Sequence, residues 1–86
     1  MRKIYFPKID DNTPFQTIWL VDILNEHDMS FSDLSRLLHV SKQTITNWAA
    51  STHPMSFPCI AALIFLLKLD DDPEDVYKTI WKEMAK

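Results

Sequence analysis

The side chains that most often bind metals or act as nucleophiles are few in this 86-residue sequence. Its only histidines and cysteine are His27, His39, His53 and Cys59, and their spacings match no zinc-ligand pair. The acidic run from Asp70 to Asp75 lacks the glycine and the spaced ligands of a calcium-binding loop. No pattern orients a serine, a histidine and an aspartate as a catalytic triad. The sequence therefore predicts no metal, no cofactor and no enzymatic activity.

The densest group of hydrogen-bonding side chains lies between residues 41 and 48. Ile45 and Trp48 are three residues apart, so on a helix they share one face, which we expect to be buried. The side chains that then point elsewhere are all polar: Lys42, Gln43, Thr46 and Asn47. This short helix is therefore expected to present amide, hydroxyl and ammonium groups on its open side.

Composition places the chain among small globular proteins. Hydrophobic residues make up 47% and charged residues 24% of the sequence, which excludes overall disorder and leaves room for one core. There is no glycine, which disfavours tight β-hairpins and excludes glycine-rich phosphate loops. A single cysteine and the lack of an apolar stretch of ~18–20 residues favour a cytoplasmic protein that is not in a membrane.

Capping residues and apolar spacing predict five helices. The expected N-caps are Thr13, Ser30, Ser41, Ser56 and Asp72. In the first helix Gln16 is expected to complete a capping box with Thr13, and the fourth helix is expected to span about residues 57–69. The core is expected to include Trp19, Trp48 and Trp81, with the alternative that Trp81 anchors a partner. We thus expect an N-terminal arm at residues 1–12 and a single all-α domain at residues 13–86.

Two of these helices are short and are joined by about three residues, which is a helix-turn-helix pattern at about residues 31–49. Their segment FSDLSRLLHVSKQTITNW, from Phe31 to Trp48, resembles the lambda-repressor/Cro-like (XRE-type) family. The positions that match its apolar scaffold and recognition-helix cap are Leu34, Leu38, Val40, Ser41, Ile45 and Trp48. The resemblance covers roughly residues 13–70 and implies a compact five-helix domain. His39 departs from it, standing where glycine is common.

The resemblance implies a sequence-specific DNA-binding transcriptional regulator of Cro or repressor type, of phage or prophage origin. The start of the recognition helix would enter the major groove of double-stranded DNA. Base contacts would come from Lys42, Gln43, Thr46 and Asn47. Contacts to the DNA backbone would come from Ser41, Thr44, Ser51, Thr52 and His53.

The charge balance bears on how such a protein would bind DNA. The net charge is −3, and residues 29–58 carry only Arg36 and Lys42 against Asp33. Each neutralised phosphate contributes about −0.9 to the slope of log affinity against log salt, so a monomer with so few cations should bind weakly. We therefore expect a homodimer on a short palindromic operator.

A different class of function stays open beside this one. The acidic balance also suits a protein-interaction module, such as an antirepressor or co-regulator that binds another regulator and does not read DNA alone. The polar face around Gln43 opposes it, because protein interfaces favour aromatic and methionine anchors.

The N-terminal arm allows two readings. Arg2 and Lys3 could enter the minor groove, as other N-terminal arms do. Ile4, Tyr5 and Phe6 instead favour packing on the body or across a dimer edge, because adjacent apolar residues rarely stay in water.

Overall fold

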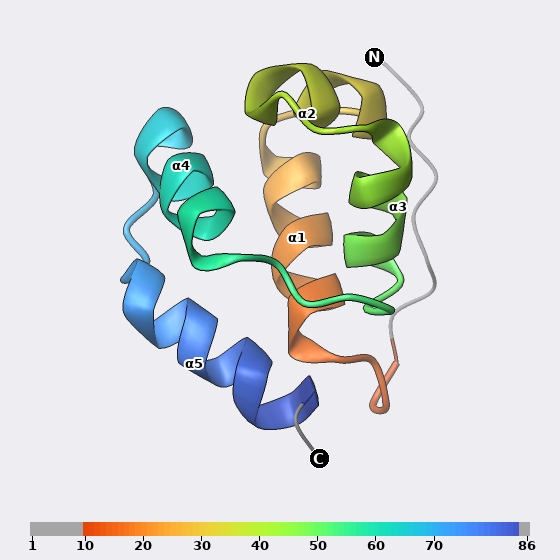
Figure 1. Cartoon of the computed structure of the whole chain (residues 1–86), viewed down its shortest axis with the longest axis vertical. Coiled ribbons are helices and arrows are strands. Elements are labelled where there is room, and N and C mark those ends of the chain that lie inside the picture. The colour runs from red at the N-terminus through yellow and green to blue at the C-terminus, as the bar shows by residue number, and fades with distance from the viewer. Residues whose placement is uncertain (1–9, 85–86) are drawn as a thin grey trace.

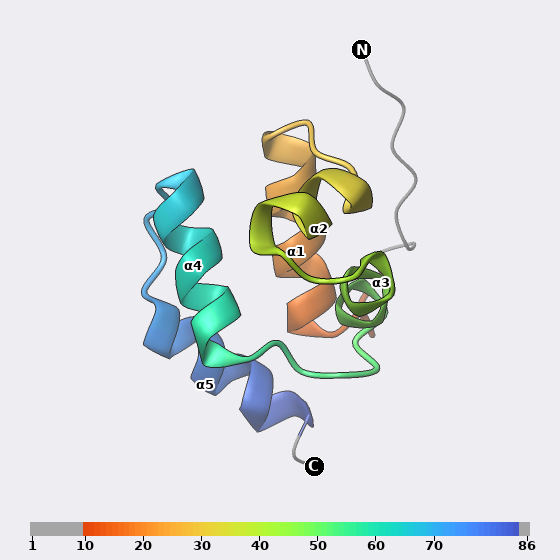
Figure 2. The ribbon, with the colours of Figure 1, turned by 45° about the horizontal axis from the view of Figure 1, so that its top comes forward.

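The computed structural model describes residues 10–84, and all of the regular secondary structure in that range is helical. The helices are α1 (Phe15–Glu26), α2 (Phe31–Leu38), α3 (Lys42–Ala49), α4 (Phe57–Leu67) and α5 (Pro73–Met84). Helix α1 runs through the middle, with α3 on one side and α4 and α5 on the other (Figures 1 and 2). The expected all-α, five-helix architecture is confirmed. The two readings of Arg2, Lys3 and the apolar residues after them lie outside the described residues.

One hydrophobic cluster joins side chains from all five helices. Leu20 and Leu24 of α1 are fully buried and belong to the same cluster as Leu34, Ile45 and Ile80 from the surrounding helices. Burial of this cluster is the main favourable contribution to folding. Between residues 10 and 84, no helix combines the length and the apolar character that crossing a membrane requires.

The tryptophans divide between core and surface. Trp19 and Trp48 are buried, as expected. The expectation for Trp81 was wrong, since 43% of this residue is exposed. The buried residues of α5 are Val76 and Ile80, and a residue one position later is turned about 100° away from that face. Trp81 instead lies edge-on to Tyr77 on the surface, with ring centroids 6.0 Å apart.

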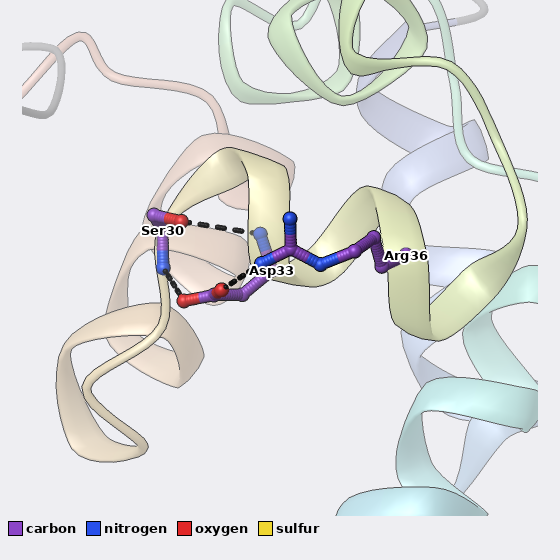
Figure 3. A network of polar contacts seen from close by, with 3 residues as sticks. All are labelled: Ser30, Asp33 and Arg36. Carbon is purple, nitrogen blue, oxygen red and sulfur yellow. Dashed lines mark hydrogen bonds and ion pairs between the residues drawn. The ribbon is translucent and has the colours of Figure 1, made fainter.

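Local capping sets the starts of three helices as the sequence predicted. In α2 the Ser30 hydroxyl accepts from the Asp33 amide at 3.1 Å, and the Asp33 carboxylate accepts from the Ser30 amide at 2.9 Å (Figure 3). The Ser41 hydroxyl accepts from the Thr44 amide at 3.1 Å. The Asp72 carboxylate accepts from the Glu74 amide at 3.0 Å. These bonds satisfy amides that the first helical turn leaves without partners.

The start of α1 differs from its prediction. Thr13 does not cap the helix; its hydroxyl accepts from the Asp10 amide at 2.7 Å within the preceding turn. Instead, Glu83 of α5 accepts from the Phe15 amide at 2.7 Å. The carboxylate therefore takes the place of a local cap and ties the two ends of the described chain together. Gln16 is buried and forms no capping box.

The fourth helix also differs in detail from its prediction. Ser56 occupies the N-cap position without a side-chain capping bond, and α4 ends at Leu67 instead of Leu69. The earlier end follows from Lys68, whose backbone is left-handed with φ 54°. A left-handed residue cannot continue a right-handed helix.

Four residues in the described range have positive φ, and each follows a helix end closely: Asp28, His39, Ser51 and Lys68. Glycine is the usual residue there, because it has no β-carbon to clash with the neighbouring carbonyl. In this glycine-free chain, ordinary side chains bear that strain of roughly 1–2 kcal/mol per position.

Replacing His39 with glycine is expected to stabilise the protein. Relief of the left-handed strain at φ 57° outweighs the extra freedom of an unfolded glycine, giving a net gain of about 0.5–1 kcal/mol. Urea denaturation measures the free energy of unfolding. Asp22→Gly, at an exposed position inside α1, is the control and should lose about 0.3–0.5 kcal/mol, because glycine is a poorer helix former than aspartate. A loss of stability in His39→Gly would contradict the strain assigned to this turn.

Candidate nucleic-acid interface

The candidate interface is built on α3, whose inner face is fixed by the core. Ile45 and Trp48 are buried at 0% and 5% exposure, which confirms the predicted helix phase. Helix α2 precedes α3 across the short turn at residues 39–41, and both pack against the rest of the bundle. The opposite face of α3 is therefore directed away from the core.

The buried side chain of Gln16 holds the C-terminal end of α3. The Gln16 amide nitrogen donates to the carbonyl of Trp48 at 2.9 Å and to that of His53 at 2.8 Å. The Gln16 amide oxygen accepts from the amide of Met55 at 2.8 Å. All three partners are backbone groups, and they lie on the end of α3 and the segment that leads to α4. Gln16 thus fixes the position of α3 relative to α1.

Thr17 adds a second bond of the same kind. Its hydroxyl donates to the Ala49 carbonyl at 2.7 Å and lies 2.7 Å from the Ser51 hydroxyl. A threonine hydroxyl has only one hydrogen, so Ser51 is the donor in the second pair. The Ser51 amide meanwhile donates to the Trp48 carbonyl at 3.1 Å. Both donors of Ser51 are therefore used inside the protein.

The roles of Gln16 and Thr17 in holding α3 were not predicted from the sequence. Two adjacent polar residues at the start of a helix whose inner face is otherwise apolar could have indicated buried hydrogen bonds. The prediction for Gln16 was wrong because a glutamine three residues after a threonine also fits a capping box.

The predicted base-contacting residues do lie together on the outer side of α3. Lys42, Gln43 and Thr46 are exposed and Asn47 is half-buried. The Gln43 amide nitrogen donates to the Asn47 side-chain oxygen at 3.0 Å. The Thr46 hydroxyl donates to the Lys42 carbonyl at 3.0 Å, one turn earlier in the same helix.

The predicted backbone-contacting residues lie at the two ends of α3. At its start, the Ser41 and Thr44 hydroxyls are exposed and 2.8 Å apart. After its end, the Thr52 amide and hydroxyl both bond to the Asn47 carbonyl, at 3.0 and 3.2 Å. His53 is exposed, and its ring nitrogen Nδ1 lies 3.3 Å from the Thr52 hydroxyl. Ser41, Thr44 and His53 thus remain accessible to a partner.

The two cations of this region differ in their surroundings. Arg36 pairs with Asp33 at 2.7 Å, although 73% of its side chain is exposed (Figure 3). Lys42 makes no ion pair with any residue between 10 and 84. The ammonium group of Lys42 is therefore available to an anionic partner. Over the same range, no three histidine, cysteine, aspartate or glutamate side chains gather as a metal site would require.

Comparison with protein-family models, with curated proteins and with solved structures finds no match to this chain.

Gln16→Leu tests whether this side chain holds α3 in place. The substitution removes a hydrogen bond from each of two carbonyls and one amide, although the Trp48 carbonyl keeps its bond from the Ser51 amide. We therefore expect the free energy of unfolding to fall by about 2–4 kcal/mol. Gln43→Leu is the matched control at an exposed position and should stay within about 0.5 kcal/mol of the parent. Chemical denaturation measures both, and equal stabilities of the two variants would refute the anchoring role.

Proposed function

We propose that the protein is a sequence-specific DNA-binding transcriptional regulator of the lambda-repressor/Cro-like (XRE-type) kind. In this proposal α2 and α3 form the helix-turn-helix, and the start of α3 enters the major groove. The observation that carries it is the two-sided character of α3. One end is bonded to buried groups of α1, while Lys42, Gln43 and Thr46 stand exposed on the outside. A rigid helix with a polar outer face suits readout of base edges.

The chemistry of the exposed side chains supports distinct roles on DNA. The Lys42 ammonium would donate to the acceptors of a guanine. The Thr46 hydroxyl is bonded to its own helix, so its methyl group would contact a thymine methyl. Ser41, Thr44 and the amides at the helix start would hold a phosphate, which the positive end of the helix dipole favours. His53 would reach the adjacent backbone.

Two predicted backbone contacts have less support than the others. Both donors of Ser51 bond within the protein, and so do those of Thr52. A phosphate accepts but does not donate hydrogen bonds. Contact by these two residues would therefore require those internal bonds to break, and we leave both residues out of the proposed contact set.

The scarcity of cations supports binding as a homodimer. With Arg36 already paired to Asp33, each copy brings few free cations to the phosphates, and two copies double them. A two-fold dimer that reads two half-sites would recognise a short palindromic operator. The interface between the two copies must then leave both α3 helices free to enter the DNA groove.

The outer side of α4 is where we place that contact between two copies. The helix has no charged side chain, yet 80% of Phe65 and 46% of Leu66 are exposed. Pro58 lies two turns before Phe65, and two alanines lie midway between them. If two such helices cross antiparallel at the alanines, each Phe65 packs against the other copy's Pro58, as an isologous contact requires. Helix α4 also lies across α1 from α3 (Figures 1 and 2).

The exposed apolar side chains of α4 also favour a second candidate function. The same exposed side chains, together with the net charge of −3, would also suit a module that binds another regulator. That regulator would then cover Phe65, and α3 would not read DNA.

Selection from a random duplex DNA library at low salt tests the proposal. We expect a palindromic consensus, with an affinity that falls steeply as salt is raised, because phosphate contacts release counterions. A library left without enrichment would refute DNA reading by this chain alone and favour the protein-interaction function.

Phe65→Ser tests the contact between copies. We expect the parent to sediment as a dimer, and the variant to sediment as a monomer that binds the selected duplex at least tenfold more weakly. Because 80% of Phe65 is exposed within one copy, its loss should leave the helical content unchanged by circular dichroism. A parent that is monomeric and still binds tightly would contradict the dimer.

A further inference from the structure

The side chains of Gln43 and Asn47 form a pair on the exposed side of α3. They are four residues apart, so they lie one above the other on the same face. The Gln43 amide nitrogen donates to the Asn47 amide oxygen at 3.0 Å. Among the proposed base-contacting residues, these are the two whose side chains bond to each other.

This bond determines which atoms of Gln43 remain available. A carboxamide has two N–H donors and one oxygen acceptor. If the N–H that points away from the amide oxygen is the one directed to Asn47, the other N–H and the oxygen are left beside each other. The available edge of Gln43 is therefore one donor next to one acceptor.

Only one base offers the complement of that edge in the major groove. Adenine presents the N7 acceptor next to the N6 donor. Guanine presents two acceptors, N7 and O6, so the Gln43 oxygen would face another oxygen. Cytosine and thymine each offer one polar group there and satisfy half of the edge.

Asn47 is better held than Gln43. Its carbonyl accepts from both the amide and the hydroxyl of Thr52, and its neighbour Trp48 is buried and bonded to Gln16. Gln43 lies on the first turn of α3 and is exposed. The bond to Asn47 therefore restrains the Gln43 side chain, which lies at the start of the helix, away from the bonds to α1.

We infer that Asn47 is a positioning residue that holds the Gln43 amide in the orientation that selects an A·T base pair. This inference rests on the proposed function. A free glutamine side chain samples several rotamers and both amide orientations, and fixing it before binding removes that entropic cost. Asn47 thus contributes to selectivity through Gln43, whether or not it touches DNA itself.

Three substitutions at Asn47 separate positioning from other effects. Asn47→Leu keeps the size but removes the acceptor. Asn47→Asp keeps an acceptor for Gln43 and adds a charge that repels phosphate. Asn47→Leu combined with Gln43→Ala shows whether the asparagine acts through the glutamine. Each is measured by competition between the selected duplex and duplexes altered at one base pair.

The base pair read by Gln43 is the one whose preference disappears in Gln43→Ala, and we expect it to be A·T. Asn47→Leu should lower that preference by about three- to tenfold, which is part of the discrimination that a good bidentate contact provides. Asn47→Asp should bind all duplexes more weakly and yet retain the preference. Adding Asn47→Leu to Gln43→Ala should change nothing further at that position.

Nuclear magnetic resonance of the free protein gives a readout that does not depend on DNA. The chain has two glutamines, and the buried Gln16 amide is an internal reference for an ordered side chain. In the parent the Gln43 side-chain amide should be nearly as ordered, and it should lose that order in Asn47→Leu but not in Asn47→Asp.

The outcomes distinguish this inference from the proposed function. If no duplex is enriched, both are overturned. If a duplex is enriched but Asn47→Leu leaves the preference at the Gln43 position intact, only the positioning role is overturned. The same holds if that base pair is not A·T, or if the Gln43 amide is equally mobile in the parent and in Asn47→Leu.

Discussion

Burying a carboxamide in an apolar core costs free energy unless each of its donors and its acceptor finds a partner. Gln16 meets this condition through three backbone groups that its own helix does not supply: two carbonyls and the amide of Met55. The bonds close only when the end of α3 and the segment after it lie against the first turn of α1. The cost of breaking them therefore specifies where α3 sits, whereas hydrophobic packing alone would tolerate small shifts.

Because α3 is bonded to α1 at one end, the two ends of the helix have different roles. Its C-terminal end is bonded to Gln16 and Thr17 and contributes to stability. Its N-terminal end carries Lys42 and Gln43 in the open and is free for recognition. Substitutions at one end should thus change unfolding and those at the other should change binding. Within the part of the chain that the structure describes, the hydrogen bond between the Gln43 and Asn47 side chains links the two ends.

Much of the fold could be predicted because its signals are local. Ser30, Ser41 and Asp72 cap helices through bonds to residues two or three positions away, which a sequence displays directly. The errors at the start of α1 concern contacts that sequence spacing does not reveal. The partner of the Phe15 amide is Glu83, 68 residues away, and those of Gln16 are 32 to 39 residues away. The candidate base-contacting residues were placed together correctly, since four positions of one helix share a side by geometry alone. Their supports in α1 depend on tertiary packing and were missed.

A map of backbone amide shifts, recorded as the selected duplex is titrated into isotope-labelled protein, shows which helix binds DNA. We expect the largest changes at residues 41–47, smaller ones around His53, and intact signals for the buried side-chain amide of Gln16. Such a pattern would mean that α3 binds DNA while the hydrogen bonds of Gln16 remain formed. Changes concentrated on α4 and α5, with residues 41–47 unaffected, would contradict DNA binding through α3.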